Sequence, residues 1–315
     1  MDLGRLLMRI RLRDLRTLAS VVSAGSMRKA AQELHMSLPA VSRSIADLES
    51  ALEVQLLVRA SSGVEPTAFG VVLVRQARVV FDELEGGLRQ LAQLADPDAG
   101  EVRLGCMETL HAGLVGACVE ELSARYPRLR MTLELGQAPD LVDYFLAQRL
   151  VDFVVARPRS LALPAGMVGT PLFRDRLRIV AGPASPYARK RRLSLRDLAE
   201  AHWIVGRNEL EPESPLVRAL KAEGLPLPQR VIRSGSLHTR HRLLAARAEF
   251  VTLVPDSLLV FDTRRERWRA LPVQLPMWES PTMVITLKDR ALAPAAALFI
   301  DHLRAMATRM TARAA

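Results

Sequence analysis

The chain has 315 residues, of which 49% are hydrophobic, and its formal net charge is +10 at pH 7. This length is enough for two or three folded units with cores of their own. No run of 18 uninterrupted apolar residues occurs, so we expect no segment that spans a membrane. The two cysteines, Cys106 and Cys118, form neither a disulfide framework nor a CxxC site, which favours a reducing, cytoplasmic location.

The positive charge is unevenly distributed along the chain. Residues 1–98 contain 12 Lys and Arg and 12 Asp and Glu, so the whole excess lies in residues 99–315. The total charge therefore does not indicate nucleic-acid binding by the N-terminal region. A basic C-terminal region can attract anionic small molecules, or its arginines can simply lie on solvated faces, and composition leaves both interpretations open.

Residues 12–53 predict three helices. Leu12–Val22 has apolar residues at helical spacing and is expected to turn one face toward a core. Its expected core residues are Leu15, Leu18, Ala19 and Val22. Ser26 then caps a short helix, because its hydroxyl can accept a hydrogen bond from a free amide of the first turn. The apolar stripe of that helix is Ala30, Ala31 and Leu34, and a tight turn at His35 and Met36 leads into the next helix.

The next short helix has two contrasting faces. Ser37 is its expected N-cap, and Pro39 lies in the first turn, where a missing amide costs nothing. Its predicted buried stripe consists of Val41, Ile45, Leu48 and Leu52. The opposite face carries Ser42, Arg43, Ser44 and Asp47. This is the layout of a helix-turn-helix, in which the second helix presents short polar groups and an arginine to the major groove of DNA.

A hairpin and a long helix follow. Leu56–Arg59 and Val64–Pro66 are strand-like and flank a turn, and Thr67 caps a helix that runs to about Leu94. The apolar residues of that helix recur at spacings of three and four, as in a coiled-coil seam. They are Leu73, Ala77, Val80, Leu84, Leu88, Leu91 and Ala95. So narrow a stripe predicts pairing with a second copy of the chain, and packing against its own domain is the alternative.

From Glu101 on, strand-like and helical segments alternate, which indicates α/β units with parallel sheets. The segments include the strands Val102–Cys106, Arg130–Leu135 and Asp152–Ala156 and the helices Leu110–Tyr126, Leu141–Gln148 and Leu237–Ala246. We therefore expect an α+β multidomain protein whose C-terminal part holds two α/β subdomains with a cleft between them. The predicted divisions are 1–66, 67–98 and 99–315, with subdomain I at 101–173 and 277–315 and subdomain II at 174–276.

Three N-terminal segments, LRDLRTLASVVSAGSMRKAAQELHMSLPAVSRSIADLE, VQLLVR and PTAFG, occur in order. This region resembles the winged helix-turn-helix of LysR-type transcriptional regulators, and the resemblance extends over nearly the whole chain. It implies a dimer-forming linker helix and an effector-binding domain of the periplasmic-binding-protein type. The implied partners are double-stranded DNA, a small-molecule effector and further copies of the chain, as a homodimer or a homotetramer.

The resemblance also gives the DNA-facing residues their expected roles. The recognition helix of the family typically reads S-Q-P-A-[LV]-S, whereas Leu38 stands at the glutamine position here. Leucine can contact only apolar groups such as a thymine methyl, so we expect a different or looser sequence preference. Base contacts are expected from Pro39, Ser42 and Arg43. Phosphate contacts, which give affinity and register, are expected from Ser26, Arg28, Lys29 and Arg59.

Effector binding is expected at the carboxyl ends of the strands, where helix N-termini can hold an anion. Relatives often have Ser or Thr in the loop after the first strand, and Thr109 is the nearest match here. Glu108 is a departure, because an unpaired acid would oppose an anionic ligand. The candidate effector residues are Glu108, Thr109, Arg207, Asn208, Ser234 and Ser236, with Thr239 beside them. Each of these can equally be an ordinary cap or a surface group.

Catalysis finds little support in the sequence. No P-loop, G-x-S-x-G or G-x-G-x-x-G motif occurs, and His238 and His241 form an HxxH pair without a nearby third ligand. We expect no metal and no cofactor. Cys106 could act as a thiol sensor, although a buried, inert thiol is the simpler interpretation. The alternative functions are a small-molecule-binding protein or enzyme whose N-terminal helices serve assembly only, and a regulator that no longer responds to a ligand.

Overall fold

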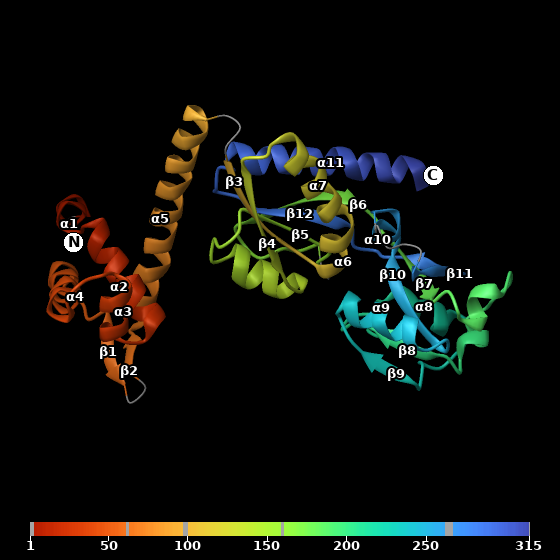
Figure 1. Ribbon diagram of the computed structural model, residues 1–315. Coiled ribbons are helices and arrows are strands. Elements are labelled where there is room, and N and C mark those ends of the chain that lie inside the picture. The colour runs from red at the N-terminus through yellow and green to blue at the C-terminus, as the bar shows by residue number, and fades with distance from the viewer. Residues whose placement is uncertain (1–2, 61–62, 97–99, 159–160, 262–266, 315) are drawn as a thin grey trace. The chain divides into compact units, whose positions relative to one another are not determined.

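The computed structural model describes residues 3–60, 63–96, 100–158, 161–261 and 267–314 (Figure 1). The chain forms two compact units, Met1–Leu88 and Arg89–Ala315, and each unit has hydrophobic cores of its own. Among the residues described, no helix is long and apolar enough to cross a membrane.

The first unit is built from helices and one hairpin. In chain order its helices are α1 (Leu3–Arg9), α2 (Leu12–Ala24), α3 (Met27–Glu33) and α4 (Leu38–Leu52). Ser26 and Ser37 cap α3 and α4 as the sequence predicts, since their hydroxyls accept hydrogen bonds from the backbone N–H of Lys29 at 3.5 Å and of Ala40 at 3.3 Å. His35, with φ 52°, makes the turn between them. The helix-turn-helix is confirmed.

The core of the first unit lies between α2, α3 and α4. Leu18, Val21 and Val41 are fully buried there, and burying one such side chain stabilises the fold by about 1.5–3 kcal/mol. The prediction that Ser44 lies on the DNA-facing side of α4 is wrong. This residue is buried and donates a hydrogen bond of 2.7 Å to Asp14 of α2, because α2 presents a buried carboxylate at that point.

The predicted wing is an antiparallel hairpin of β1 (Leu57–Ala60) and β2 (Gly63–Pro66). Gly63 adopts φ 130°, and a Cβ atom at this position would lie 2.4 Å from the carbonyl oxygen of Gly25. The backbone N–H of Val64 donates to that same carbonyl at 3.0 Å. Only glycine allows this close approach, which ties the base of the hairpin to the end of α2. The tip residues 61–62 lie outside the described residues.

Helix α5 (Ala68–Ala95) is the long helix expected from the sequence. The prediction that Ala77 belongs to the pairing seam is wrong, because this residue is buried in the core of the first unit and is not available to a second chain. Leu73 is half-buried against the same core. Four further members are exposed, namely Val80, Leu84, Leu88 and Leu91, and the side chain of Ala95 lies outside the described residues. Phe69, Val71 and Val72 are further exposed apolar residues that the seam pattern did not include.

The second unit contains two five-stranded sheets. The first has the order β4-β3-β5-β12-β6. Its strands are β3 (Gly100–Cys106), β4 (Leu129–Leu135), β5 (Phe153–Ala156), β6 (Met167–Phe173) and β12 (Thr282–Leu287). β3 is parallel to β4 and β5, but β12 is antiparallel to β5 and β6. The sheet is therefore mixed rather than parallel as predicted, because β12 is added when the chain returns from the other sheet.

Both faces of this sheet are covered. Alternate residues of β5 point to opposite sides, with Phe153 and Val155 in one core and Val154 and Ala156 in the other. The first face is covered by helices α7 (Gly116–Arg125) and α11 (Pro294–Ala314), as Figure 1 shows, and the second by η2 (Asp140–Leu146). Burial on both faces is why β5 is a continuous apolar run.

The helix expected at Leu110–Tyr126 is interrupted in the structure. It is divided into α6 (Glu108–Leu110), η1 (His111–Val115) and α7. The break lies at Gly113, whose backbone has φ −106° and ψ −114°. A Cβ atom on Gly113 would lie 3.2 Å from the Cα of Leu258, so a neighbouring segment presses against this glycine. Contact with a segment so distant in sequence was not visible in the local helical pattern.

The second sheet has the order β11-β7-β10-β8-β9. Its strands are β7 (Arg176–Ala181), β8 (His202–Val205), β9 (Val231–Arg233), β10 (Phe250–Pro255) and β11 (Arg269–Met277). The surrounding helices are η3 (Pro186–Arg189), η4 (Arg196–Leu198), α8 (Pro215–Ala222), α9 (Leu237–Ala246) and α10 (Asp256–Phe261). The chain crosses from the first sheet to the second at residues 174–175 and returns to the first sheet at residues 278–281. These two segments are called the first and second crossings.

Candidate functional site

The DNA-facing candidates lie on the outer surface of α3 and α4. Pro39, Ser42 and Arg43 are exposed on α4, while its opposite face is buried in the core. Leu38 is also exposed, at the beginning of that helix. The first turns of the helix therefore present one short polar group, one guanidinium and two apolar side chains outward. That arrangement allows hydrogen bonds and apolar contacts with base edges.

The phosphate-contact candidates are placed beside this surface. Arg28 and Lys29 are exposed on α3, and Ser26 is half-buried at its N-cap. Within the described part of the chain, neither Arg28 nor Lys29 forms a salt bridge with an acid, and the same holds for Arg43. Their charges are thus not neutralised internally. The side chain of Arg59 lies outside the described residues, so only its backbone, in β1, is placed.

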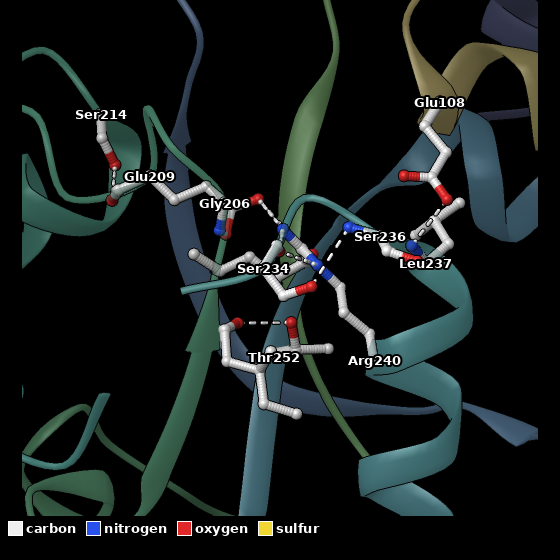
Figure 2. Close-up of polar contacts among 11 residues, drawn as sticks. Glu108, Gly206, Glu209, Ser214, Ser234, Ser236, Leu237, Arg240 and Thr252 are labelled. Atoms are coloured by element: carbon white, nitrogen blue, oxygen red, sulfur yellow. Dashed lines mark hydrogen bonds and ion pairs between the residues drawn. The ribbon is translucent and has the colours of Figure 1, made fainter. Parts of the chain in front are cut away.

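In the second unit, the sequence-predicted effector residues gather where α9 begins. Figure 2 shows that Glu108 of α6 points toward this helix, and its Oε1 accepts a hydrogen bond of 2.8 Å from the backbone N–H of Leu237. Ser236 caps α9 by accepting from the N–H of Thr239 at 3.4 Å. Its own N–H donates to the hydroxyl of Ser234 at 3.3 Å. The helix N-terminus, where an anionic ligand was expected, is therefore occupied by the chain's own Glu108 carboxylate.

A buried ion pair that the sequence did not predict lies next to these residues. Arg240 of α9 is 3% exposed and donates to Oε1 of Glu209 from both Nη atoms at 3.1 Å. The other oxygen of Glu209 accepts from the N–H of Gly206 at 2.7 Å, and Arg240 also donates to the carbonyl of Ser234 (Figure 2). The two partners are 31 residues apart, so no local spacing indicated the pair. It holds the loop after β8 against the first turn of α9.

The space around the expected effector residues is small. Glu108, Thr109, Arg207 and Asn208 line a cavity of about 70 Å³. Small-molecule sites generally enclose about 300–1,000 Å³. Among the described residues that line it, neither Ser234 nor Ser236 appears, although Gly235 between them does. The predicted residues are thus brought together, but they enclose too little space for a small organic ligand.

An adjoining cavity of about 440 Å³ is large enough. It shares Met107, Arg157, Asn208 and Trp278 with the small cavity. The guanidinium of Arg157, which follows β5, lies 4.2 Å from the centre of the Trp278 ring. Burial lowers the pKa of Arg157 to about 10, while Asp175 and Glu209 act in the opposite direction, so the side chain stays protonated at neutral pH. Sequence reasoning missed both residues, because Arg157 follows β5 whereas Trp278 lies in the second crossing, 121 positions further along the chain.

The thiols and histidines offer no reactive centre in the described residues. Burial raises the pKa of Cys106 to about 12, and burial together with Glu121 raises that of Cys118 to about 12. Since the thiolate is the reactive form, neither side chain fits the thiol sensor considered from the sequence. His241 packs against Trp268 with ring centres 4.0 Å apart and ring planes tilted by 49°. The residues described contain no group of three side chains that could hold a metal ion.

Comparison with known proteins identifies both units. Residues 12–71 match the family described as bacterial regulatory helix-turn-helix protein, lysR family, and residues 95–308 match the LysR substrate binding domain. The HTH-type transcriptional regulator GbpR of Azospirillum brasilense is 27% identical over 312 residues, covering 97% of this chain and 89% of GbpR.

Solved structures show the same fold at lower identity. A full-length OxyR variant from Pseudomonas aeruginosa has a TM-score of 0.63 and 22% identity, covering 95% of this chain and 94% of the other. Full-length CbnR in complex with its target DNA has a TM-score of 0.61 and 20% identity, covering 94% of this chain and 100% of the other.

Proposed function

Because the chain belongs to the LysR family of bacterial transcriptional regulators, we propose that it acts in the cytoplasm by placing two or four copies of its first unit on double-stranded DNA. The observation that carries this proposal is the outer surface of α3 and α4, where Arg28, Lys29 and Arg43 are exposed and form no internal salt bridge within the described chain. Unneutralised cations beside a recognition helix attract DNA phosphates and release counterions on binding.

The roles within this surface follow from the chemistry of each group. Arg43 can form paired hydrogen bonds with a guanine edge, and Ser42 and Pro39 lie beside it on α4. Lys29, Arg28 and Ser26 are placed for the phosphate backbone, which positions the protein without reading sequence. Arg59 of the wing is assigned to a phosphate on the resemblance alone. Leu38 replaces a polar contact by an apolar one, so one base pair of the site is read by shape or by a thymine methyl.

Two substitutions test these roles. Arg43→Ala is expected to weaken binding to the specific site by about 1–3 kcal/mol and to leave binding to scrambled DNA nearly unchanged. Lys29→Ala is expected to weaken binding to both DNAs alike and to reduce the slope of log affinity against log salt by about 1. Fluorescence anisotropy titrations on both DNAs measure the two effects.

The matched control is Lys221→Ala, which removes one exposed positive charge from α8 in the second unit. It is expected to bind both DNAs as the unaltered protein does. If Arg43→Ala and Lys29→Ala lost affinity equally on both DNAs, the division into base and phosphate contacts would be wrong.

We further propose that three segments of the chain have separate roles. Residues 1–66 bind DNA, residues 67–98 pair two chains, and residues 99–315 bind a small-molecule effector without transforming it. Support for pairing comes from the exposed apolar residues of α5, and support for effector binding comes from the cavities between the two sheets of the second unit. An effector can change the DNA geometry only if it binds one arrangement of the protein more tightly than another.

A further inference from the structure

The cavity of about 440 Å³ has the size of a small-molecule site, since such sites generally enclose about 300–1,000 Å³. It is lined by the end of β5, by the loop that precedes α8 and by the crossing that follows β11. Ser214 of the loop is already engaged, because its hydroxyl donates to the carbonyl of Glu209. The groups that can meet a ligand must therefore be found elsewhere in the lining.

Two buried polar atoms of the lining have no hydrogen-bond partner in the described structure. They are the indole Nε1 of Trp278 and the hydroxyl of Ser280, and both belong to the second crossing between the sheets. A buried polar group without a partner is unfavourable, and native proteins rarely keep one without a reason. Indole N–H can only donate, so the missing partner of Trp278 is a hydrogen-bond acceptor.

The charged group in the same cavity also lacks an acceptor. Arg157 rests against the Trp278 ring, and within the described residues its guanidinium forms neither a hydrogen bond nor a salt bridge. A guanidinium carries five N–H donors and binds carboxylates in pairs of hydrogen bonds. Arg157, Trp278 and Ser280 together therefore provide a site for an anionic oxygen group.

The helix N-terminus of α9 does not compete for that group. Glu108 already supplies a carboxylate to the N–H of Leu237, and the cavity beside it holds only about 70 Å³. An incoming anion would have to displace Glu108 and would meet its negative charge. An anionic group of a ligand is therefore bound more favourably beside Arg157, in the larger cavity, than at the N-terminus of α9.

Three acidic residues also line this cavity. Glu211, Glu213 and Glu279 line the same cavity, and Glu279 is paired with Arg218 at 3.1 Å. A ligand with negative charge along its whole length would be repelled by Glu211 and Glu213. A ligand with hydrogen-bond donors at its far end would instead be bound by these carboxylates.

We propose, building on the effector-binding role assigned above, that the effector is a small carboxylate whose other end carries hydroxyl or ammonium groups. Arg157, Trp278 and Ser280 bind its carboxylate, and Glu211 and Glu213 bind its donors. A hydroxy acid and an amino acid share this chemistry, and binding assays separate the two.

Tryptophan fluorescence provides the test, because Trp278 lines the cavity whereas Trp203 and Trp268 are buried in the cores. The full-length protein is titrated with gluconate, L-serine and L-glutamine, and with glucose and butyrate as controls. Gluconate or one of the amino acids should bind at least tenfold more tightly than both controls, because glucose lacks the carboxylate and butyrate lacks the donors. Binding by gluconate alone identifies a hydroxy acid, and binding by the amino acids alone identifies an amino acid. If no carboxylate binds, or butyrate binds as tightly as the others, the proposal is overturned.

Variants distinguish a binding role from a structural one. Arg157→Gln should lower the affinity for the carboxylate ligand by about tenfold or more. Ser280→Ala should also lower this affinity. The melting temperature of the ligand-free protein should stay equal or rise, because the substitution removes an unpaired buried hydroxyl. Ser185→Ala is the matched control, since Ser185 also has a buried hydroxyl without a partner and does not line the cavity. It should leave affinity unchanged, and equal effects of the two serine variants on affinity would contradict the proposal.

DNA binding separates this inference from the function on which it rests. Selective DNA binding by a protein that binds none of the carboxylates would overturn the effector class and leave the regulator intact. Carboxylate binding by a protein without DNA affinity would overturn the proposed function and leave the ligand site standing.

Discussion

Replacing Asp152 by alanine is expected to lower the free energy of unfolding of the second unit by about 3–5 kcal/mol. Asp152 is 3% exposed, and its Oδ1 lies 3.0 Å from Arg290, 3.5 Å from Arg103 and 3.7 Å from Arg89. Its Oδ2 accepts from the backbone N–H of Arg103 at 2.8 Å. Without this carboxylate, three guanidinium groups lose a counter-charge that they share in a largely buried region.

Urea denaturation followed by tryptophan fluorescence measures this effect, because all three tryptophans of the chain lie in the second unit. The matched control is Asp301→Ala, whose exposed carboxylate pairs with Arg304 at 3.1 Å on α11. An exposed pair of this kind contributes about 0.2–1 kcal/mol. If the two variants unfolded at the same urea concentration, the cluster around Asp152 would not stabilise the unit.

Placing aspartate at both Leu88 and Leu91 is expected to separate the two chains of the proposed dimer and to lower affinity for a two-half-site DNA by about 100-fold or more. These side chains are 58% and 63% exposed on α5, which leaves them free to pack against a second copy. Two charges in that contact would be buried without partners. A single chain then binds one half-site at a time and loses the higher affinity that a second, linked DNA-binding unit provides.

Sedimentation velocity and DNA titration measure the two consequences together. Gln90→Asp is the control, because it adds one negative charge to the same helix at an exposed position outside the apolar stripe. A double Leu variant that sediments as the unaltered protein does would show that α5 is not the pairing element.

The parts of the structure that sequence predicted are those set by neighbouring residues. The caps at Ser26 and Ser37 depend on amides three positions ahead, and the core faces of α2 and α4 depend on helical spacing. Ser44 was misplaced because its partner, Asp14, lies 30 residues away. Ala77 was misplaced because the apolar stripe of α5 begins inside the unit's own core and only later becomes exposed.

The candidate site was less predictable, because long-range pairs define it. Glu108 was expected to oppose an anionic ligand unless it was paired, and its partner at Leu237 is 129 residues away. Arg240 and Glu209, and Arg157 and Trp278, come from separate segments whose proximity depends on the order of strands in two sheets. Sequence patterns identify which groups follow each strand, but they do not identify which of those groups neutralise one another.

Binding of the purified full-length protein to the DNA next to its own gene, compared with scrambled DNA across a salt series, tests the central claim most directly. The account predicts affinity for the specific DNA that is tighter by about 1,000-fold or more, and a linear fall of log affinity with log salt as counterions are released. Absence of binding to either DNA at low salt would contradict the claim that this chain regulates transcription through its first unit.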